Sequence, residues 1–108
     1  MTGYDADAAA IQEQKQRHFD ARELADLALK HPDRLVGLRW LRWTYRTEPM
    51  HERDRYVRDL AIQLVLQECT DADVAAWSEM QRAVVYMMGA MASKHMNRAA
   101  PVALGRAA

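Results

Sequence analysis

Three short breaks divide this chain into stretches of strong helix formers. They are His31-Pro32-Asp33, Thr47-Glu48-Pro49 and Cys69-Thr70. Proline removes a backbone donor and disfavours helix in the residue before it, while Asp33 and Thr70 have side chains that cap a following helix. Between the breaks Ala, Leu, Arg, Gln, Glu and Met dominate, and no stretch alternates as a strand does. The chain is therefore predicted to be all-α.

These breaks predict a small bundle of four helices within one domain, residues 19–96. Asp20 and Glu23 have capping-box spacing and Phe19 can staple onto Leu24, so the first helix is expected from Asp20 to about Lys30. The others are expected at 34–46, from near Pro49 to about residue 68, and at 71–96. Residues 1–18 are an extension of the first helix, an additional N-terminal helix or a mobile arm, because one large aliphatic side chain cannot bury much surface. Residues 97–108 are expected to be a disordered tail.

Length, charge and cysteine content exclude several classes of protein. A chain of 108 residues forms one domain, and its 15 basic and 15 acidic residues give no overall pull toward nucleic acid or membrane. Cys69 is the single cysteine, so no internal disulfide is expected. The N-terminus lacks the features of a secretory signal, and the longest apolar stretch, 83–92, is about half a membrane span. A cytoplasmic protein is expected, with no membrane contact.

The second predicted helix has two apolar sides. Leu38, Leu41 and Tyr45 fall on one side, and Val36, Trp40 and Trp43 fall on another. An arginine stripe separates them. Such a helix is either covered on both sides within the monomer or offers its aromatic side to another protein, because Trp and Arg are enriched at binding hot spots. The first candidate partner-binding set is Arg39, Trp40, Arg42, Trp43 and Arg46.

The fourth predicted helix has a methionine-rich face. Its members at helical periodicity are Trp77, Met80, Val84, Met87, Met88 and Met91. Methionine is flexible and suits a surface that accommodates a partner, although filling of the core is the alternative. The second candidate partner-binding set is Met87, Met88 and Met91.

Charges are segregated along the chain. Residues 34–58 contain seven Arg against three acids, whereas residues 59–79 contain five acids and no base. The basic segment either pairs internally with the acidic turns around Glu68, Asp71 and Asp73 or contacts phosphates, with Trp40 or Trp43 stacking on bases. The pairs Asp54 with Arg58 and Arg55 with Asp59 have i,i+4 spacing and are interpreted as solvent-exposed.

Catalytic and metal-binding signals are few. Glu48 and His51 have the Glu-x-x-His spacing of di-iron bundles, but those sites need a second copy and further glutamates. Cys69 precedes a helix start, where a thiol pKa can fall, but a small apolar contact is the commoner role. His95-Met96 lacks a haem-attachment motif, and His95 is interpreted as a surface residue. No enzyme activity, metal or other cofactor is expected.

The sequence therefore favours a non-enzymatic module that binds another protein as a regulator, adaptor or inhibitor, with a homodimer as part of that hypothesis. The alternative is a nucleic-acid-binding protein that uses the segment Arg34 to Arg58.

Overall fold

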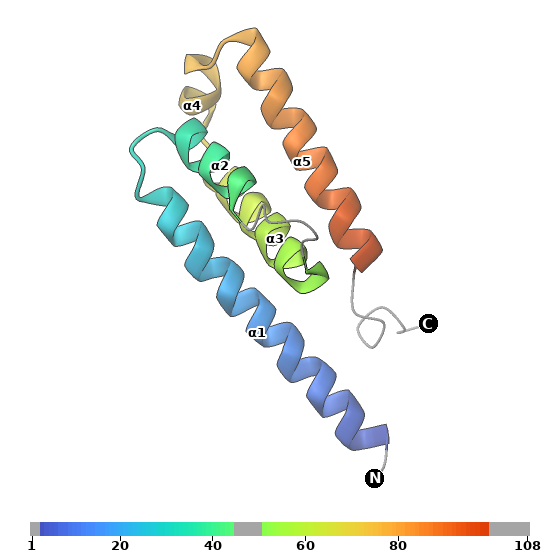
Figure 1. The fold of residues 1–108 in the computed structure, drawn as a ribbon. Coiled ribbons are helices and arrows are strands. Elements are labelled where there is room, and N and C mark those ends of the chain that lie inside the picture. The colour runs from blue at the N-terminus through green and yellow to red at the C-terminus, as the bar shows by residue number, and fades with distance from the viewer. Residues whose placement is uncertain (1–2, 45–50, 100–108) are drawn as a thin grey trace.

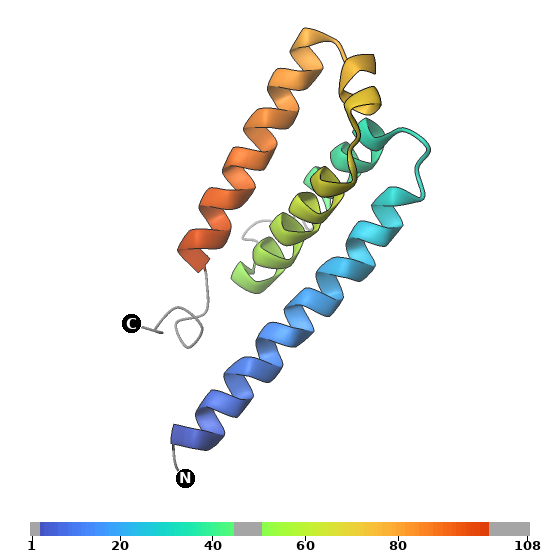
Figure 2. The same cartoon turned by 180° about the vertical axis from the view of Figure 1, so that it is seen from behind.

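The protein is an all-α bundle, as predicted, and the residues that the structure describes form five helices instead of the predicted four. The structure, a computed structural model, describes residues 3–44 and 51–99, and these contain no strand. The helices are α1 (Gly3–Leu29), α2 (Arg34–Trp43), α3 (Glu52–Glu68), α4 (Asp71–Ala76) and α5 (Glu79–Ala99). Figure 1 shows α1 and α3 running in the same direction and α5 running back. Helices α1 and α5 both pack on α3, and α2 packs on α1 and α3 (Figure 2).

Two of the predicted caps are confirmed. The carboxylate of Asp33 accepts a hydrogen bond from the Leu35 amide at 2.9 Å and starts α2. Thr70 and Asp73 form a reciprocal capping box that starts α4. Helix α2 ends at Trp43, earlier than the predicted residue 46, because Thr44 has an extended backbone and is its C-cap. Tyr45 and Arg46 lie outside the described residues.

The predicted helix start at Asp20 is wrong, because α1 is continuous from Gly3 to Leu29. Residues 3–18 are thus the helix extension and not an arm. An N-cap needs a non-helical backbone, and the preceding Ala- and Gln-rich residues give the helix no reason to stop. Phe19 is 59 % exposed and makes no staple.

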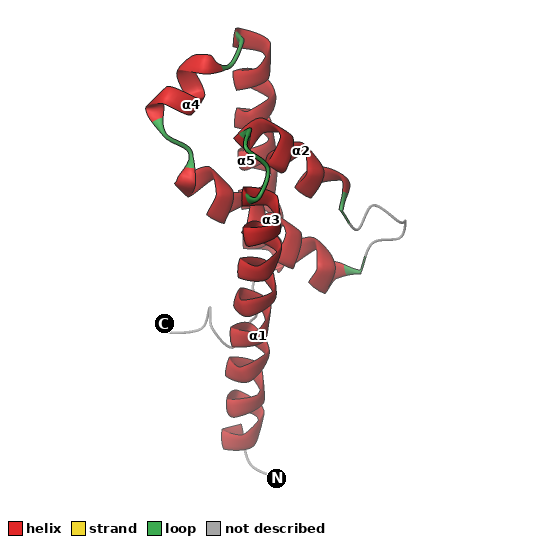
Figure 3. Ribbon diagram, turned by 90° about the vertical axis from the view of Figure 1, so that its left-hand side faces the viewer, coloured by secondary structure: helices red, strands yellow, loops and turns green. Residues whose placement is uncertain are grey.

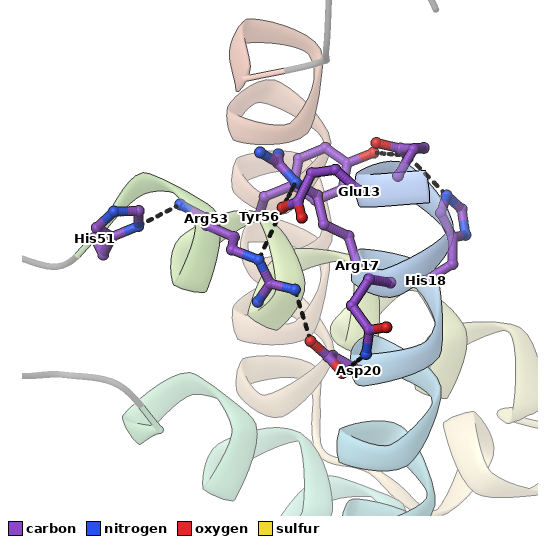
Figure 4. Close-up of polar contacts among 9 residues, drawn as sticks. Glu13, Arg17, His18, Asp20, His51, Arg53 and Tyr56 are labelled. Carbon is purple, nitrogen blue, oxygen red and sulfur yellow. Dashed lines mark hydrogen bonds and ion pairs between the residues drawn. The ribbon is translucent and has the colours of Figure 1, made fainter. Parts of the chain in front are cut away.

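Instead of capping α1, Asp20 holds it to α3. Asp20 Oδ2 accepts from Arg53 Nη2 at 2.7 Å, and Glu13 Oε1 accepts from Arg53 Nε at 2.9 Å (Figure 4). One turn along α3, Tyr56 accepts from Gln14 at 2.9 Å, and the Arg17 guanidinium lies 5.1 Å from the Tyr56 ring centroid. The Arg53 guanidinium lowers the pKa of the Asp20 carboxyl through that hydrogen bond. The network joins residues at least 33 positions apart and fixes how α1 lies along α3.

The fourth predicted helix is broken into α4 and α5 at Trp77 and Ser78. The Ser78 hydroxyl accepts from the Gln81 amide at 3.2 Å, while the Gln81 side chain accepts from the Ser78 amide at 2.8 Å. These bonds form a second capping box, which stabilises a new helix start. Figure 3 shows α4 standing away from the line of α5 as a result. Helix α5 continues to Ala99, so residues 97–99 are helical and the prediction of a tail from residue 97 is wrong there. Residues 100–108 lie outside the described part.

The core lies where α1, α2, α3 and α5 meet. Leu38 and Leu41 of α2 and Val65 of α3 are fully buried, against a row of small residues on α1 that includes Ala21, Ala25 and Ala28. These small side chains let α2 approach α1 closely. Within the described residues, no helix has both the length and the apolar character needed to cross a membrane.

Candidate functional site

The two predicted partner-binding sets meet in one groove. A hollow of about 250 Å³ lies between α2, α3 and α5. Helix α2 contributes Arg42 and Trp43 to it, and α5 contributes Met87, Met88 and Met91. Five of the eight candidate residues therefore line a single site, which we call the α2–α5 groove.

The aromatic side of α2 is open to solvent. Val36, Trp40 and Trp43 are 45 %, 37 % and 56 % exposed, whereas Leu38 and Leu41 on the other side have no exposed surface. The Trp40 ring lies 6.2 Å from the His31 ring, centroid to centroid. Helix α2 is therefore covered on its Leu side only, and not on both sides within the monomer.

The described arginines of the α2 stripe are not neutralised by acidic side chains of the described residues. Arg39 and Arg42 are exposed, and neither makes an ion pair with any residue in the part of the chain that the structure describes. The pKa of the Asp73 carboxyl is lowered chiefly by its hydrogen bonds with Thr70, and the charge of Arg34 at the start of α2 adds only a smaller contribution. Arg46 lies outside the described residues. The stripe thus leaves basic groups at and beside the α2–α5 groove.

The methionine set divides between surface and core. Met87 and Met91 are 59 % and 48 % exposed, but Met88 is 6 % exposed and belongs to the core. The sequence predicted that Trp77 shares the helix face of these methionines, and this is wrong. Helix α4 ends just before Trp77, which is its buried C-cap, and α5 begins after Ser78. Met87 and Met91 are accordingly the accessible methionines of the groove.

A buried carboxylate forms part of the groove's wall. Asp59 is 2 % exposed, and it is the only buried charged residue among those described. Its Oδ1 accepts from Arg58 Nη2 at 3.2 Å, and its Oδ2 lies 3.2 Å from His95 Nδ1. The predicted exposed pair with Arg55 is wrong. His95, interpreted as a surface residue, has 23 % of its side chain exposed and also contacts this carboxylate. The missed signal is that Asp59 shares a helix face with Ile62 and Leu66, which are themselves covered.

Burial raises the pKa of the Asp59 carboxyl, although Arg58 and His95 act in the opposite direction. A raised pKa in the folded state means that the native protein binds this proton more readily than the unfolded chain. Its contribution to stability is therefore fully present below the pKa of the unfolded carboxyl and is lost as pH rises through the folded pKa. Asp59→Asn preserves the shape of the side chain but cannot ionise. The variant should therefore not lose this stability as pH rises.

We expect the free energy of unfolding of Asp59→Asn, relative to the unsubstituted protein, to increase as pH rises through that window. Urea unfolding between about pH 4 and about pH 8 measures it. Asp7→Asn, which removes an exposed carboxylate, shows the effect of the charge change alone. A difference that is constant with pH, or that shrinks as pH rises, would contradict the assignment.

The other noted side chains have structural roles. His51 is the N-cap of α3, where its Nδ1 accepts from the Arg53 amide at 3.2 Å, while Glu48 lies outside the described residues. Cys69 packs against the core as the small apolar contact that the sequence favoured, and burial, together with the charge of Asp73, raises the pKa of its thiol. The described residues contain no group of three or more His, Cys, Asp or Glu arranged to hold a metal ion.

Comparisons with protein-family models, curated proteins and solved structures found no match to this chain. The functional argument therefore depends on the α2–α5 groove itself.

Proposed function

We propose that this protein is a non-enzymatic binding module that holds an acidic amphipathic helix of another protein in the α2–α5 groove. The observation that carries the proposal is the convergence of Trp43, Met87 and Met91 on one groove, each about half exposed. Exposed apolar side chains gathered in a groove are typical of sites that take the apolar face of a helix. Methionine can adapt to the shape of that face.

Charge supports an acidic partner. Arg42 and Arg58 line the groove, and Arg39 is exposed on the same helix as Arg42. The one carboxylate in the lining, Asp59, already has Arg58 and His95 against it. The groove therefore offers positive charge in excess, which favours carboxylates on the partner and steers its approach. A symmetric contact between two copies would set these arginines against each other, which disfavours the homodimer.

Nucleic acid is the second candidate. Exposed Trp40 and Trp43, beside exposed Arg39 and Arg42, are the groups that single strands stack on and pair with. On this hypothesis affinity falls steeply with salt concentration, since each neutralised phosphate releases counterions.

Photo-crosslinking in cells that contain the protein tests the proposal. A benzophenone amino acid replaces Met91 in the groove or, as a control, exposed Gln12 on α1. We expect crosslinks from position 91 only, to a peptide that maps to an acidic amphipathic helix, and their loss when Arg42→Glu is added.

Three results would overturn the proposal. Crosslinks between copies of this chain would identify a homodimer interface. Crosslinks to nucleic acid would favour the second candidate. Equal crosslinking from positions 12 and 91 would show that the groove is not a specific site.

A further inference from the structure

A second hollow lies on a different face of α5 from the α2–α5 groove. It has a volume of about 440 Å³ and is bounded by α3, α4 and α5. Leu66, Val74, Trp77 and Val85 supply its apolar walls, and Arg82 lies at its α4 end. Trp77 and Val85 are buried, so these walls are fixed by the core. We call this hollow the α4 pocket.

The break between α4 and α5 accounts for the α4 pocket. Because α4 stands away from α5 (Figure 3), it forms a third wall and does not fill the space beside α5. At the other end Gln63 Nε2 donates to Gly89 O at 3.0 Å and to Ser93 Oγ at 2.9 Å, which ties α3 to α5. From Arg82 to Ser93 the α5 wall is about 16 Å long at 1.5 Å per residue.

Charge in the α4 pocket is of one sign. Arg82 is its only charged lining residue, and among the described residues it has no ion pair. No Asp or Glu is among the described residues that line the pocket. Cys69 also lines it, and because burial raises the pKa of that thiol, Cys69 is a neutral, weakly polar part of the wall.

We propose that the α4 pocket binds a medium-length aliphatic monocarboxylate, of about eight to twelve carbons. Its volume is within the range of small-molecule sites, which are mostly apolar with a few placed polar groups. The alkyl chain packs along Leu66, Val74 and Trp77, where burial of apolar surface stabilises it. The carboxylate binds the Arg82 guanidinium, which can donate two charge-assisted hydrogen bonds.

The tryptophans provide a test of where such a ligand binds. Decanoate, below the concentration at which it forms micelles, is titrated into the full ¹⁵N-labelled chain while the indole N–H resonances are followed. Trp77 lines the α4 pocket, whereas Trp43 lines the α2–α5 groove. We expect a saturable shift of the Trp77 indole resonance while those of Trp40 and Trp43 stay in place.

Substitutions separate the roles of charge and cavity. Arg82→Gln is expected to weaken decanoate about tenfold or more and to leave the neutral analogue decanol unchanged, as hydrogen bonds to charged groups imply. Arg98→Gln, on the exposed Arg98 of the same helix, is the charge control. Ala90→Leu places a bulky side chain in the pocket and should weaken both compounds, whereas Ala83→Leu, on an exposed residue outside it, should weaken neither. Circular dichroism verifies that each variant is folded.

Several results would overturn the proposal. Failure of decanoate to shift the Trp77 resonance would show that the pocket does not take this ligand class. Larger shifts at Trp40 or Trp43 would place binding elsewhere. Equal effects of Arg82→Gln on decanoate and decanol would show that Arg82 does not bind the carboxylate. None of these results bears on the crosslinking test of the α2–α5 groove.

Discussion

Gly37→Ala is expected to lower the free energy of unfolding by about 2–3 kcal/mol, as overpacking of a core does. A Cβ atom built on Gly37 would lie 2.5 Å from the carbonyl oxygen of Ala28 and 3.2 Å from its carbonyl carbon. Both are backbone atoms of α1, so no side chain can turn aside to relieve the contact. Helices α1 and α2 must separate, and this costs more than the gain of about 1 kcal/mol from replacing glycine inside a helix. Urea unfolding followed by circular dichroism measures the change.

Gly89→Ala is the matched control. Its Cβ would lie 3.1 Å from Leu66 Cδ1, which is the end of a flexible side chain and can move by a few tenths of an ångström. The gain in helix propensity then offsets the contact, and stability should be nearly unchanged. If Gly37→Ala were as stable as Gly89→Ala, α1 and α2 would not approach each other as closely as described.

The fold class could be predicted because the helix caps are formed by residues that are close together in the sequence. The caps at Asp33 and Thr70 use side chains and amides within three residues of each other, so sequence spacing is sufficient to identify them. The same kind of signal was present at Ser78-x-x-Gln81 but was hidden within a continuous apolar periodicity. That capping box divides the predicted fourth helix and gives rise to the α4 pocket.

The error at Asp20 has a different cause. Its spacing to Glu23 satisfies the capping pattern, yet its carboxylate is bound by Arg53, 33 positions away in the chain. A sequence pattern cannot exclude a partner supplied by tertiary packing. Figure 4 shows Asp20 and Glu13 on either side of the same guanidinium.

The residues of the candidate site were more predictable than the site itself. Helical periodicity identified the Trp side of α2 and the Met face of the last helix as separate surfaces. Their meeting in one groove depends on how α2 and α5 pack against α3, which periodicity does not determine. Asp59 was misplaced for a related reason, because its ion-pair spacing with Arg55 suggested solvent where α5 in fact covers it.

Leu41→Ala is expected to cost about 2–5 kcal/mol of unfolding free energy, the range for removing a buried leucine side chain and leaving a cavity. Leu41 has no exposed surface and lies on the inner side of α2. Trp43→Ala, two residues along the same helix, should cost less than half as much despite removing a larger side chain, because Trp43 is 56 % exposed. Urea unfolding of both variants under the same conditions makes the comparison.

The comparison also bears on the proposed function. A residue that contributes little to stability and still lines a groove is free to be selected for binding, whereas a residue that the fold requires is not. If Trp43→Ala destabilises the protein as much as Leu41→Ala, Trp43 belongs to the core and the α2–α5 groove loses its aromatic wall. If Trp43→Ala leaves stability nearly intact, the same variant becomes a sharp probe of the groove, since any loss of crosslinking from position 91 then reports on partner contact and not on unfolding.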